Sequence, residues 1–256
     1  QTSNYVGVTL GFACGRLSFH IDTAASVNIL TPEKAQETQA ARTGVSASSQ
    51  GATSASAIQG YEVSLGEAQL GGVDLRGAQF RAVVMQAPVG PAKAGLIGLS
   101  FLDAFDAVEF RWGERPGEVV FHPPGSVSWE ELSQGMATVD LERLPGSNLL
   151  CARICVGGSE PILALIDTGA PLTIGNKATG LPTDPSIPGM TVAGADGRPI
   201  TLRVTPGKPQ ITLADGRVLG CASVLVGDLP GFAVLNAGPN TPGTGVGAGP
   251  QASTCH

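Results

Sequence analysis

Two short segments of this chain are near copies of each other, 145 residues apart. Residues 22–30 read Asp-Thr-Ala-Ala-Ser-Val-Asn-Ile-Leu, and residues 167–175 read Asp-Thr-Gly-Ala-Pro-Leu-Thr-Ile-Gly. Each aspartate follows an apolar run, at 17–21 and at 162–166, and such short runs are typical of buried strands. A strand that delivers one carboxylate and occurs twice predicts an internal pseudo-twofold axis that brings two carboxylates together.

The composition indicates how such a chain is organised. Glycine and proline account for 36 and 19 of the 256 residues, which favours many short strands and turns over long helices. A hydrophobic fraction of 42% at this length allows two lobes with a core each. We expect an all-β protein with one lobe at 1–125, a connecting segment at 126–147, a second lobe at 148–238, and a Gly/Pro-rich tail or degenerate lobe end at 239–256.

Charge and hydropathy argue against several kinds of partner. A formal net charge of −6 disfavours nucleic acid and anionic membrane surfaces, and no apolar run approaches the roughly 20 residues that span a bilayer. Five cysteines whose spacing fits no zinc motif indicate free or buried thiols, so we expect no metal and no organic cofactor. The first residue is Gln1, which we read as a processed terminus, and the Ala/Gly-rich composition suits an imported organellar protein, for instance of a plastid.

Two carboxyl groups held together have a specific chemistry. At a separation of about 3 Å both cannot ionise, so the pair shares a proton and titrates with two split apparent pKa values. The ionised member can activate water while the protonated member polarises a peptide carbonyl. We expect Asp22 and Asp167 to form this pair, and Thr23 and Thr168 to bond across the interface between the two loops.

The motifs resemble those of a known family. Residues 167–169 match the Asp-Thr-Gly motif of the retropepsin-like and pepsin-like aspartic proteases, and residues 22–24 match it with Ala in place of Gly. The family has an apolar pair plus Gly that threads a psi-shaped loop under the active site, and Leu96-Ile97-Gly98 fits this pattern. The chain is similar to two retropepsin units fused in tandem, over residues 5–122 and 149–236.

This resemblance implies an all-β, bilobal acid-protease fold with two six-stranded-type β-barrel lobes related by a pseudo-twofold axis. It implies an aspartic endopeptidase whose partner is a peptide or protein substrate and whose dyad is Asp22 and Asp167. Four residues would support the dyad: Thr23, Ala24, Thr168 and Gly169. Two hairpins would close over the substrate as flaps, with Ile58, Gln59, Gly60 and Tyr61 in the first and Gly194, Ala195, Asp196 and Gly197 in the second.

Two departures from the family pattern support an alternative. Ala24 costs roughly 1 kcal/mol if its position requires a positive φ, and nothing otherwise. The second lobe has no clear counterpart of residues 96–98, which the offset places near 241–243. The alternative is a catalytically inactive pseudo-protease that serves as a structural or assembly subunit of a larger complex, and a third possibility is peptide binding without hydrolysis.

His20 lies two residues before Asp22 and therefore on the same face of the strand. Two readings stay open for it: a group that tunes the protonation of the dyad, or a hydrogen-bonded histidine of the core.

Overall fold

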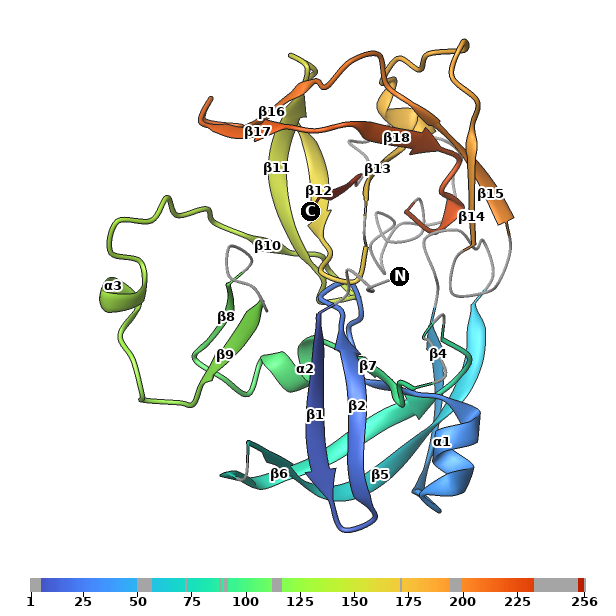
Figure 1. Ribbon diagram of the computed structural model, residues 1–256, viewed down its shortest axis with the longest axis vertical. Coiled ribbons are helices and arrows are strands. Elements are labelled where there is room, and N and C mark those ends of the chain that lie inside the picture. The colour runs from blue at the N-terminus through green and yellow to red at the C-terminus, as the bar shows by residue number, and fades with distance from the viewer. Residues whose placement is uncertain are drawn as a thin grey trace.

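The computed structural model of the chain describes residues 6–49, 57–71, 73–87, 89, 92–111, 117–170, 172–193, 199–232 and 253–255. Strands dominate it, and two large sheets form a lower and an upper lobe in Figure 1. Among the residues described, no helix has the length and apolar character needed to cross a bilayer. The predominance of strands and the two large sheets make the fold all-β and bilobal, as the sequence predicted.

The N-terminal lobe contains a closed barrel. Its strands run in the order β1-β2-β7-β3-β6-β5-β4, and an additional pairing of β1 with β5 closes the six strands other than β4 into a ring. Alternating residues such as Leu10, Phe19 and Val63 point inward and are almost completely buried. The strands are β1 (Gly7–Phe12), β2 (Gly15–Ile21), β3 (Ile29–Leu30), β4 (Ala41–Ser49), β5 (Ile58–Leu70), β6 (Val73–Val84) and β7 (Gly95–Ile97).

Short helices and a hairpin complete this lobe. Helix α1 (Pro32–Glu37) begins with Pro at its first position and is capped by the Thr31 hydroxyl, which accepts from the Lys34 N–H. Helix α2 (Leu99–Leu102) follows β7 directly and leads to the hairpin of β8 (Ala107–Arg111) and β9 (Glu118–His122). A chain of ring contacts ties α2 and the hairpin to the barrel, through Phe12, Phe19, Phe80, Phe101, Phe105 and Phe121.

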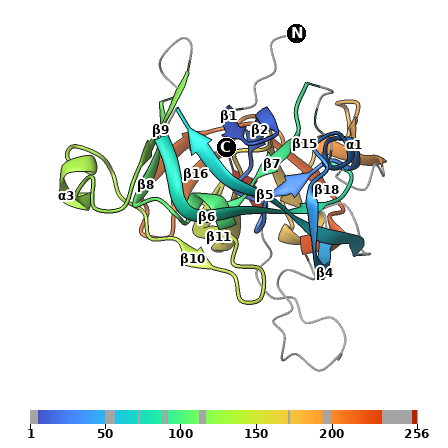
Figure 2. The same ribbon diagram turned by 90° about the horizontal axis from the view of Figure 1, so that it is seen from below.

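The connecting segment carries helix α3 (Trp129–Leu132), which has a capping box formed by Ser128 and Glu131. It ends in β10 (Glu142–Arg143), which pairs with β11 and so joins the sheet of the second lobe. In both views α3, β8, β9 and β10 lie on one side of the molecule, and β4 and β15 lie on the opposite side (Figures 1 and 2).

The C-terminal lobe repeats the strand order of the first. Here β11, β12, β19, β13, β18, β15 and β14 take the places of β1, β2, β7, β3, β6, β5 and β4, with the same parallel and antiparallel senses. This repeat is the pseudo-twofold symmetry that the sequence predicted. The elements are β11 (Leu150–Val156), β12 (Ile162–Ile166), β13 (Thr173–Asn176), the 3-10 helix η1 (Lys177–Thr179), β14 (Met190–Ala193), β15 (Pro199–Val204), β18 (Val224–Gly227) and β19 (Ser253–Cys255).

The two lobes differ in how the first strand continues the sheet. In the second lobe β11 pairs on its outer edge with the hairpin of β16 (Gln210–Leu213) and β17 (Val218–Cys221). The strand β15 has six residues, whereas its counterpart β5 has 13 and reaches round to β1. The long β5 is therefore what closes the first barrel.

The sequence offset misplaces one strand. It puts the counterpart of residues 96–98 near 241–243, which lie outside the described residues, but the structure has β19 in that place. Thr254 stands opposite Leu165 and Cys255 opposite Ile166, as Leu96 and Ile97 stand opposite His20 and Ile21. The offset fails here because a longer segment separates β18 from β19 than separates β6 from β7.

Candidate active site

Both aspartates sit at the end of a strand, each in a tight turn of the same geometry. The N–H of Asp22 donates to the carbonyl of Ile97 at 2.9 Å, which fixes the end of β2 against β7. The N–H of Ala24 donates to Asp22 Oδ1, and the N–H of Gly169 donates to Asp167 Oδ1, each at 2.8 Å. An aspartate that accepts from the N–H two residues later has a fixed side-chain direction, so both carboxyl groups are oriented in the same way.

A reciprocal set of hydrogen bonds joins the two turns. The Thr23 hydroxyl accepts from the Thr168 N–H at 3.0 Å and donates to the Ile166 carbonyl at 2.6 Å. The Thr168 hydroxyl accepts from the Thr23 N–H at 3.2 Å and donates to the Ile21 carbonyl at 3.0 Å. Every donor and acceptor of this interlock is satisfied by the other lobe, so it fixes the distance between the turns that carry the aspartates.

The two carboxyl groups are close enough to interact directly. A hydrogen bond joins the side chains of Asp22 and Asp167, which requires one of them to carry a proton. The pKa of Asp22 is raised to about 7, chiefly by burial and next by the neighbouring charge of Asp167, while the hydrogen bond from the Ala24 N–H opposes the shift. The pair therefore holds one shared proton at mildly acidic pH, where an isolated aspartate would be ionised.

Ala24 is compatible with its turn. Its φ is not in the left-handed region, so the substitution of Ala for Gly carries no backbone strain. The pseudo-equivalent Gly169 is more restricted, because a Cβ there would lie 2.7 Å from Cγ and 2.9 Å from Oδ2 of Asp22. The glycine of the second motif thus leaves room for the Asp22 carboxyl group, and the first motif does not need a glycine for its backbone conformation.

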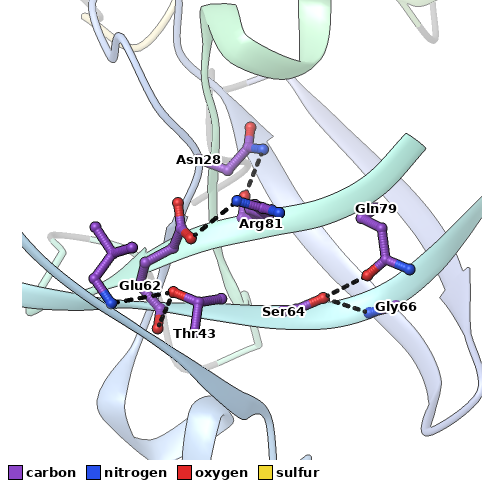
Figure 3. Close-up of polar contacts among 8 residues, drawn as sticks. Asn28, Thr43, Glu62, Ser64, Gly66, Gln79 and Arg81 are labelled. Carbon is purple, nitrogen blue, oxygen red and sulfur yellow. Dashed lines mark hydrogen bonds and ion pairs between the residues drawn. The ribbon is translucent and has the colours of Figure 1, made fainter. Parts of the chain in front are cut away.

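The psi-shaped loop behind Asp22 is held by an asparagine that the sequence analysis did not single out. The Oδ1 atom of Asn28 accepts from the Gly98 N–H at 3.0 Å. Its Nδ2 atom donates to the Arg81 carbonyl at 2.9 Å (Figure 3). Asn28 is 4% exposed, and a Cβ on Gly98 would collide with the carbonyl oxygens of Ala25 and Val27. The only local signal for this role was a polar residue within an apolar run.

The first expected flap maps onto the β4–β5 hairpin. Ile58, Gln59, Gly60 and Tyr61 begin β5 and pair with Ser49, Ser48, Ala47 and Ser46 of β4. The guanidinium of Arg42 lies 3.8 Å from the ring centroid of Tyr61, and the outer face of the sheet carries the Glu62–Arg81 ion pair and the Ser64–Gln79 hydrogen bond (Figure 3). These contacts stiffen the strands at the base of the hairpin.

The second expected flap maps onto β14 and β15, which form an antiparallel hairpin. Gly194, Ala195, Asp196 and Gly197 lie outside the described residues, between these two strands. Strands β4, β14 and β15 all lie on the right of Figure 1.

His20 belongs to the core of the first lobe. It is 7% exposed and stands in β2 opposite Gly7 of β1 and Leu96 of β7. Burial lowers its pKa, and the positive charge of Lys93 lowers it further. Low exposure and a lowered pKa favour a neutral core histidine over a group that tunes the dyad.

Other titratable groups do not add to this site. Cys14, Cys151, Cys155 and Cys221 are free thiols, as the sequence predicted, and burial raises the pKa of Cys151 to about 11. Within the described ranges, no three His, Cys, Asp or Glu side chains converge as metal ligands would.

Comparisons with known proteins agree with the motifs. Residues 13–104, which include Asp22 and β7, match the family described as "gag-polyprotein putative aspartyl protease". The family match supports the predicted place of the chain in the retropepsin-like aspartic protease superfamily.

Among solved structures, the chain is similar to a retropepsin-like aspartic protease from Rickettsia conorii. The identity is 18%, the alignment covers 46% of this chain and 83% of that one, and the TM-score is 0.33. A search of curated proteins found no match.

Proposed function

We propose that this chain is an aspartic endopeptidase in which Asp22 and Asp167 activate a water molecule for attack on a peptide bond. The observation that carries the proposal is the hydrogen-bonded pair of carboxyl groups, one from each lobe, with the pKa of Asp22 raised to about 7. A pair that shares a proton can offer a base and an acid at the same pH. The family match of the first lobe suggests the same activity.

The reaction uses the pair twice. The ionised carboxylate takes a proton from water while the water oxygen bonds to the peptide carbonyl carbon, and the protonated carboxyl group donates its proton to the carbonyl oxygen. The tetrahedral intermediate collapses when the carboxyl group that took the water proton gives it to the amide nitrogen, the other carboxylate takes a proton from a hydroxyl group of the intermediate, and the C–N bond breaks. The pair then returns to its starting state with one proton. Because the pair titrates as a unit, neither aspartate is assigned the role of acid or base.

The surrounding residues act by positioning. The interlock of Thr23 and Thr168 would hold the carboxyl groups at a fixed separation, and the N–H groups of Ala24 and Gly169 would fix their direction. The substrate would lie extended between the hairpins at 58–61 and 194–197 and form strand-like backbone hydrogen bonds with them.

The test is cleavage of a quenched-fluorescent peptide library between pH 3 and 7. We expect Asp22→Asn and Asp167→Asn to stay folded and to lose about 10²- to 10⁴-fold in rate, the range that positioned acid and base groups contribute. Asp215→Asn is the matched control, since Asp215 is half-exposed, bonds to Arg217 and lies in the β16–β17 turn. Undiminished cleavage by either dyad variant would overturn the assignment.

A second candidate is an inactive pseudo-protease that serves as a subunit of a complex. The sheet of the second lobe favours it, because this sheet continues into β16 and β17 instead of closing through its β5 counterpart. It predicts that the wild-type chain cleaves no library peptide at any pH and co-purifies with a stable partner. Saturable peptide binding without cleavage would instead indicate a binding module.

A further inference from the structure

We propose that the β16–β17 hairpin and the segment that connects the lobes form a docking surface for a partner polypeptide rich in apolar and basic residues. The surface comprises residues 129–142 and 215–221, and we call it the connector surface. The partner would add one strand to the sheet of the second lobe, along β17. This inference goes beyond the proposed function, because the surface contains neither dyad, interlock nor flap residues and the binding requires no hydrolysis.

Four large apolar side chains of the connector surface are more than half exposed. Trp129 of α3 and Met136 of the connecting segment are 63% and 64% exposed, and Val218 and Leu219 of β17 are 58% and 53% exposed. Elsewhere in the described part of the chain, Val45 in β4 is the one large apolar residue that is also more than half exposed. Exposed apolar side chains that gather on one side of a molecule mark an interaction site.

A hydrogen bond fixes the connecting segment beside the hairpin. The guanidinium of Arg217, which directly precedes β17, donates to the Thr138 carbonyl at 2.7 Å. Val139, the next residue, packs against the core of the second lobe. In Figure 1 the β16–β17 hairpin points to the left, the side on which α3 and β10 lie, whereas β4, β14 and β15 lie on the right. The two parts therefore belong to one surface.

Strand β17 offers a free backbone edge. It is the last strand of its sheet and pairs with β16, and no strand among the described residues pairs with its other edge. Residues 218–221 include no charged residue and no proline, which commonly protect such an edge. The pairing register skips Leu219, so Leu219 and Val218 are both exposed instead of pointing to opposite faces. An added strand would bond to this edge and cover both side chains.

The charge of the connector surface favours a basic partner. Residues 123–142 include no Lys or Arg and four acidic residues, which are Glu130, Glu131, Asp140 and Glu142. The two arginines that reach this surface already have carboxylate partners, since Arg153 pairs with Glu142 and Arg217 pairs with Asp215. The charges of the other three acidic residues are left for a partner. Cations of the partner would be attracted to them, and acidic groups would be repelled.

The same charges argue against a second copy of this chain as the occupant. A twofold interface places identical surfaces against each other, so the acidic segment would face its own copy. The formal net charge of −6 adds to this repulsion. A strand in which apolar and basic residues alternate avoids it, because its apolar face can cover β17 while its cations reach the acidic residues.

The probe for the test is a fluorescein-labelled peptide with the sequence Lys-Leu-Lys-Val-Lys-Leu-Lys. Its binding to the full chain is measured by anisotropy, with Asp22→Asn in the chain to prevent cleavage. We expect saturable binding that weakens as the salt concentration rises from about 50 to about 300 mM. Two control peptides, one with Glu in place of Lys and one with Ser in place of the apolar residues, should bind at least about tenfold more weakly.

One pair of variants tests the apolar contact. Leu219→Ser removes it without a change of charge and should weaken binding of the probe at least about fivefold. Val45→Ser is the matched control, since Val45 is 51% exposed and Leu219 is 53% exposed, but Val45 lies in β4 of the first flap hairpin. A loss of affinity with Val45→Ser and none with Leu219→Ser would place the probe between the flaps and overturn the proposal.

A second set of variants tests the charges. Glu130→Gln combined with Asp140→Asn removes two exposed charges of the connector surface and should weaken binding about threefold. Glu33→Gln combined with Glu67→Gln removes two exposed charges of the first lobe and should leave the affinity within about 1.5-fold. Equal effects of the two combinations would show attraction to the net charge alone, against the proposal.

Crosslinking locates the probe without relying on a variant. A photo-reactive group replaces the central valine of the peptide, and crosslinks to residues 136–141 or 217–221 support the proposal. Crosslinks confined to other residues, absence of saturable binding, or equal binding of the Glu-containing peptide would each overturn it. A dimer of the wild-type chain that Leu219→Ser dissociates, observed by sedimentation, would identify a second copy as the occupant and also overturn it. None of these readouts depends on the outcome of the cleavage assay.

Discussion

At the scale of single residues, the asymmetry between Ala24 and Gly169 makes a prediction. A Cβ on Gly169 would lie 2.7 Å from Cγ of Asp22, so Gly169→Ala has to displace that carboxyl group. We expect cleavage to fall by about 100-fold, since a displacement of about 1 Å at the reacting groups has an effect of this size. The measurement is the rate on a peptide found to be cleaved by the wild-type chain.

Two controls separate displacement from a general effect of adding a methyl group. Gly11→Ala adds it in β1, where the nearest atoms of Gln69 are at an ordinary 3.4 Å, and should leave the rate unchanged. Ala24→Gly removes the methyl group from the first motif and should also preserve activity, because Ala24 is not strained. If Gly169→Ala retains the full rate, the fit between Gly169 and Asp22 does not matter for the chemistry.

The sequence identified the residues of the motif but not those that support it from a distance. Asp22, Asp167 and the two threonines form a pattern that repeats at one spacing, and the structure places them together as expected. Asn28 bonds to groups that lie 53 and 70 residues away along the chain. Its partners are known only when the fold is known, so no local pattern could predict its role.

At the scale of elements, Asn28 links β3, β6 and the start of α2. Asn28→Ala would leave the Gly98 N–H and the Arg81 carbonyl without their partner in a buried place. We expect a loss of about 1–3 kcal/mol in the free energy of unfolding, measured by urea denaturation. Thr43→Ala is the control, because Thr43 also bonds to the backbone of the same sheet but is exposed, and its effect should stay within about 0.5 kcal/mol. Equal effects of the two changes would contradict this account.

Some elements carry local signals that a sequence can show. Helix α1 begins with Pro32 directly after the cap residue Thr31, and helix α3 begins directly after the cap residue Ser128. The strand β19 has no such signal. Its three residues read Ser-Thr-Cys, and they form a strand only because they pair with β12 and β13. Both of these strands are remote from β19 along the chain, so no local pattern predicts the pairing.

At the scale of the whole molecule, the dyad makes stability depend on pH. Because the pKa of Asp22 is raised from 3.8 to about 7, the folded state keeps a proton that the unfolded state releases. Stability is therefore unaffected by this group below about pH 4, falls as the pH rises from about 4 to 7, and stays low above that range. Urea denaturation at pH 4, 5.5, 7 and 8 measures this slope.

Replacement of the group isolates its share of the slope. Asp22→Asn should flatten the fall between about pH 4 and 7 and be more stable than the wild type at pH 8, because it has no charge to desolvate. Asp215→Asn should keep the slope, since its hydrogen bonds to Arg217 lower the pKa of Asp215 and move its contribution to more acidic pH. Parallel curves for the wild type and Asp22→Asn would show that Asp22 does not titrate in this range.

The lobes are joined by two kinds of contact that differ in strength. The Thr23–Thr168 interlock consists of four hydrogen bonds between buried or half-buried groups, whereas the Asp103–Arg143 ion pair has side chains that are 40% and 43% exposed. Thr168→Val removes one acceptor and one donor, and it leaves the Thr23 N–H and the Ile21 carbonyl without partners. We expect it to cost about 1–3 kcal/mol, against about 0–1 kcal/mol for Asp103→Asn, where water replaces the lost contact.

Thermal unfolding distinguishes these two contacts. A loss of 1 kcal/mol shifts Tm by about 2–4 °C for a chain of this size, so Thr168→Val should lower Tm by several degrees and Asp103→Asn by little. Thr168→Ser keeps the hydroxyl group and should retain both stability and the cleavage rate. Because valine has nearly the shape of threonine, this pair of variants assigns the loss in Thr168→Val to the missing hydroxyl group. If Asp103→Asn is the more damaging change, the lobes are held together at the periphery, and the dyad depends on the connecting segment rather than on its own two turns.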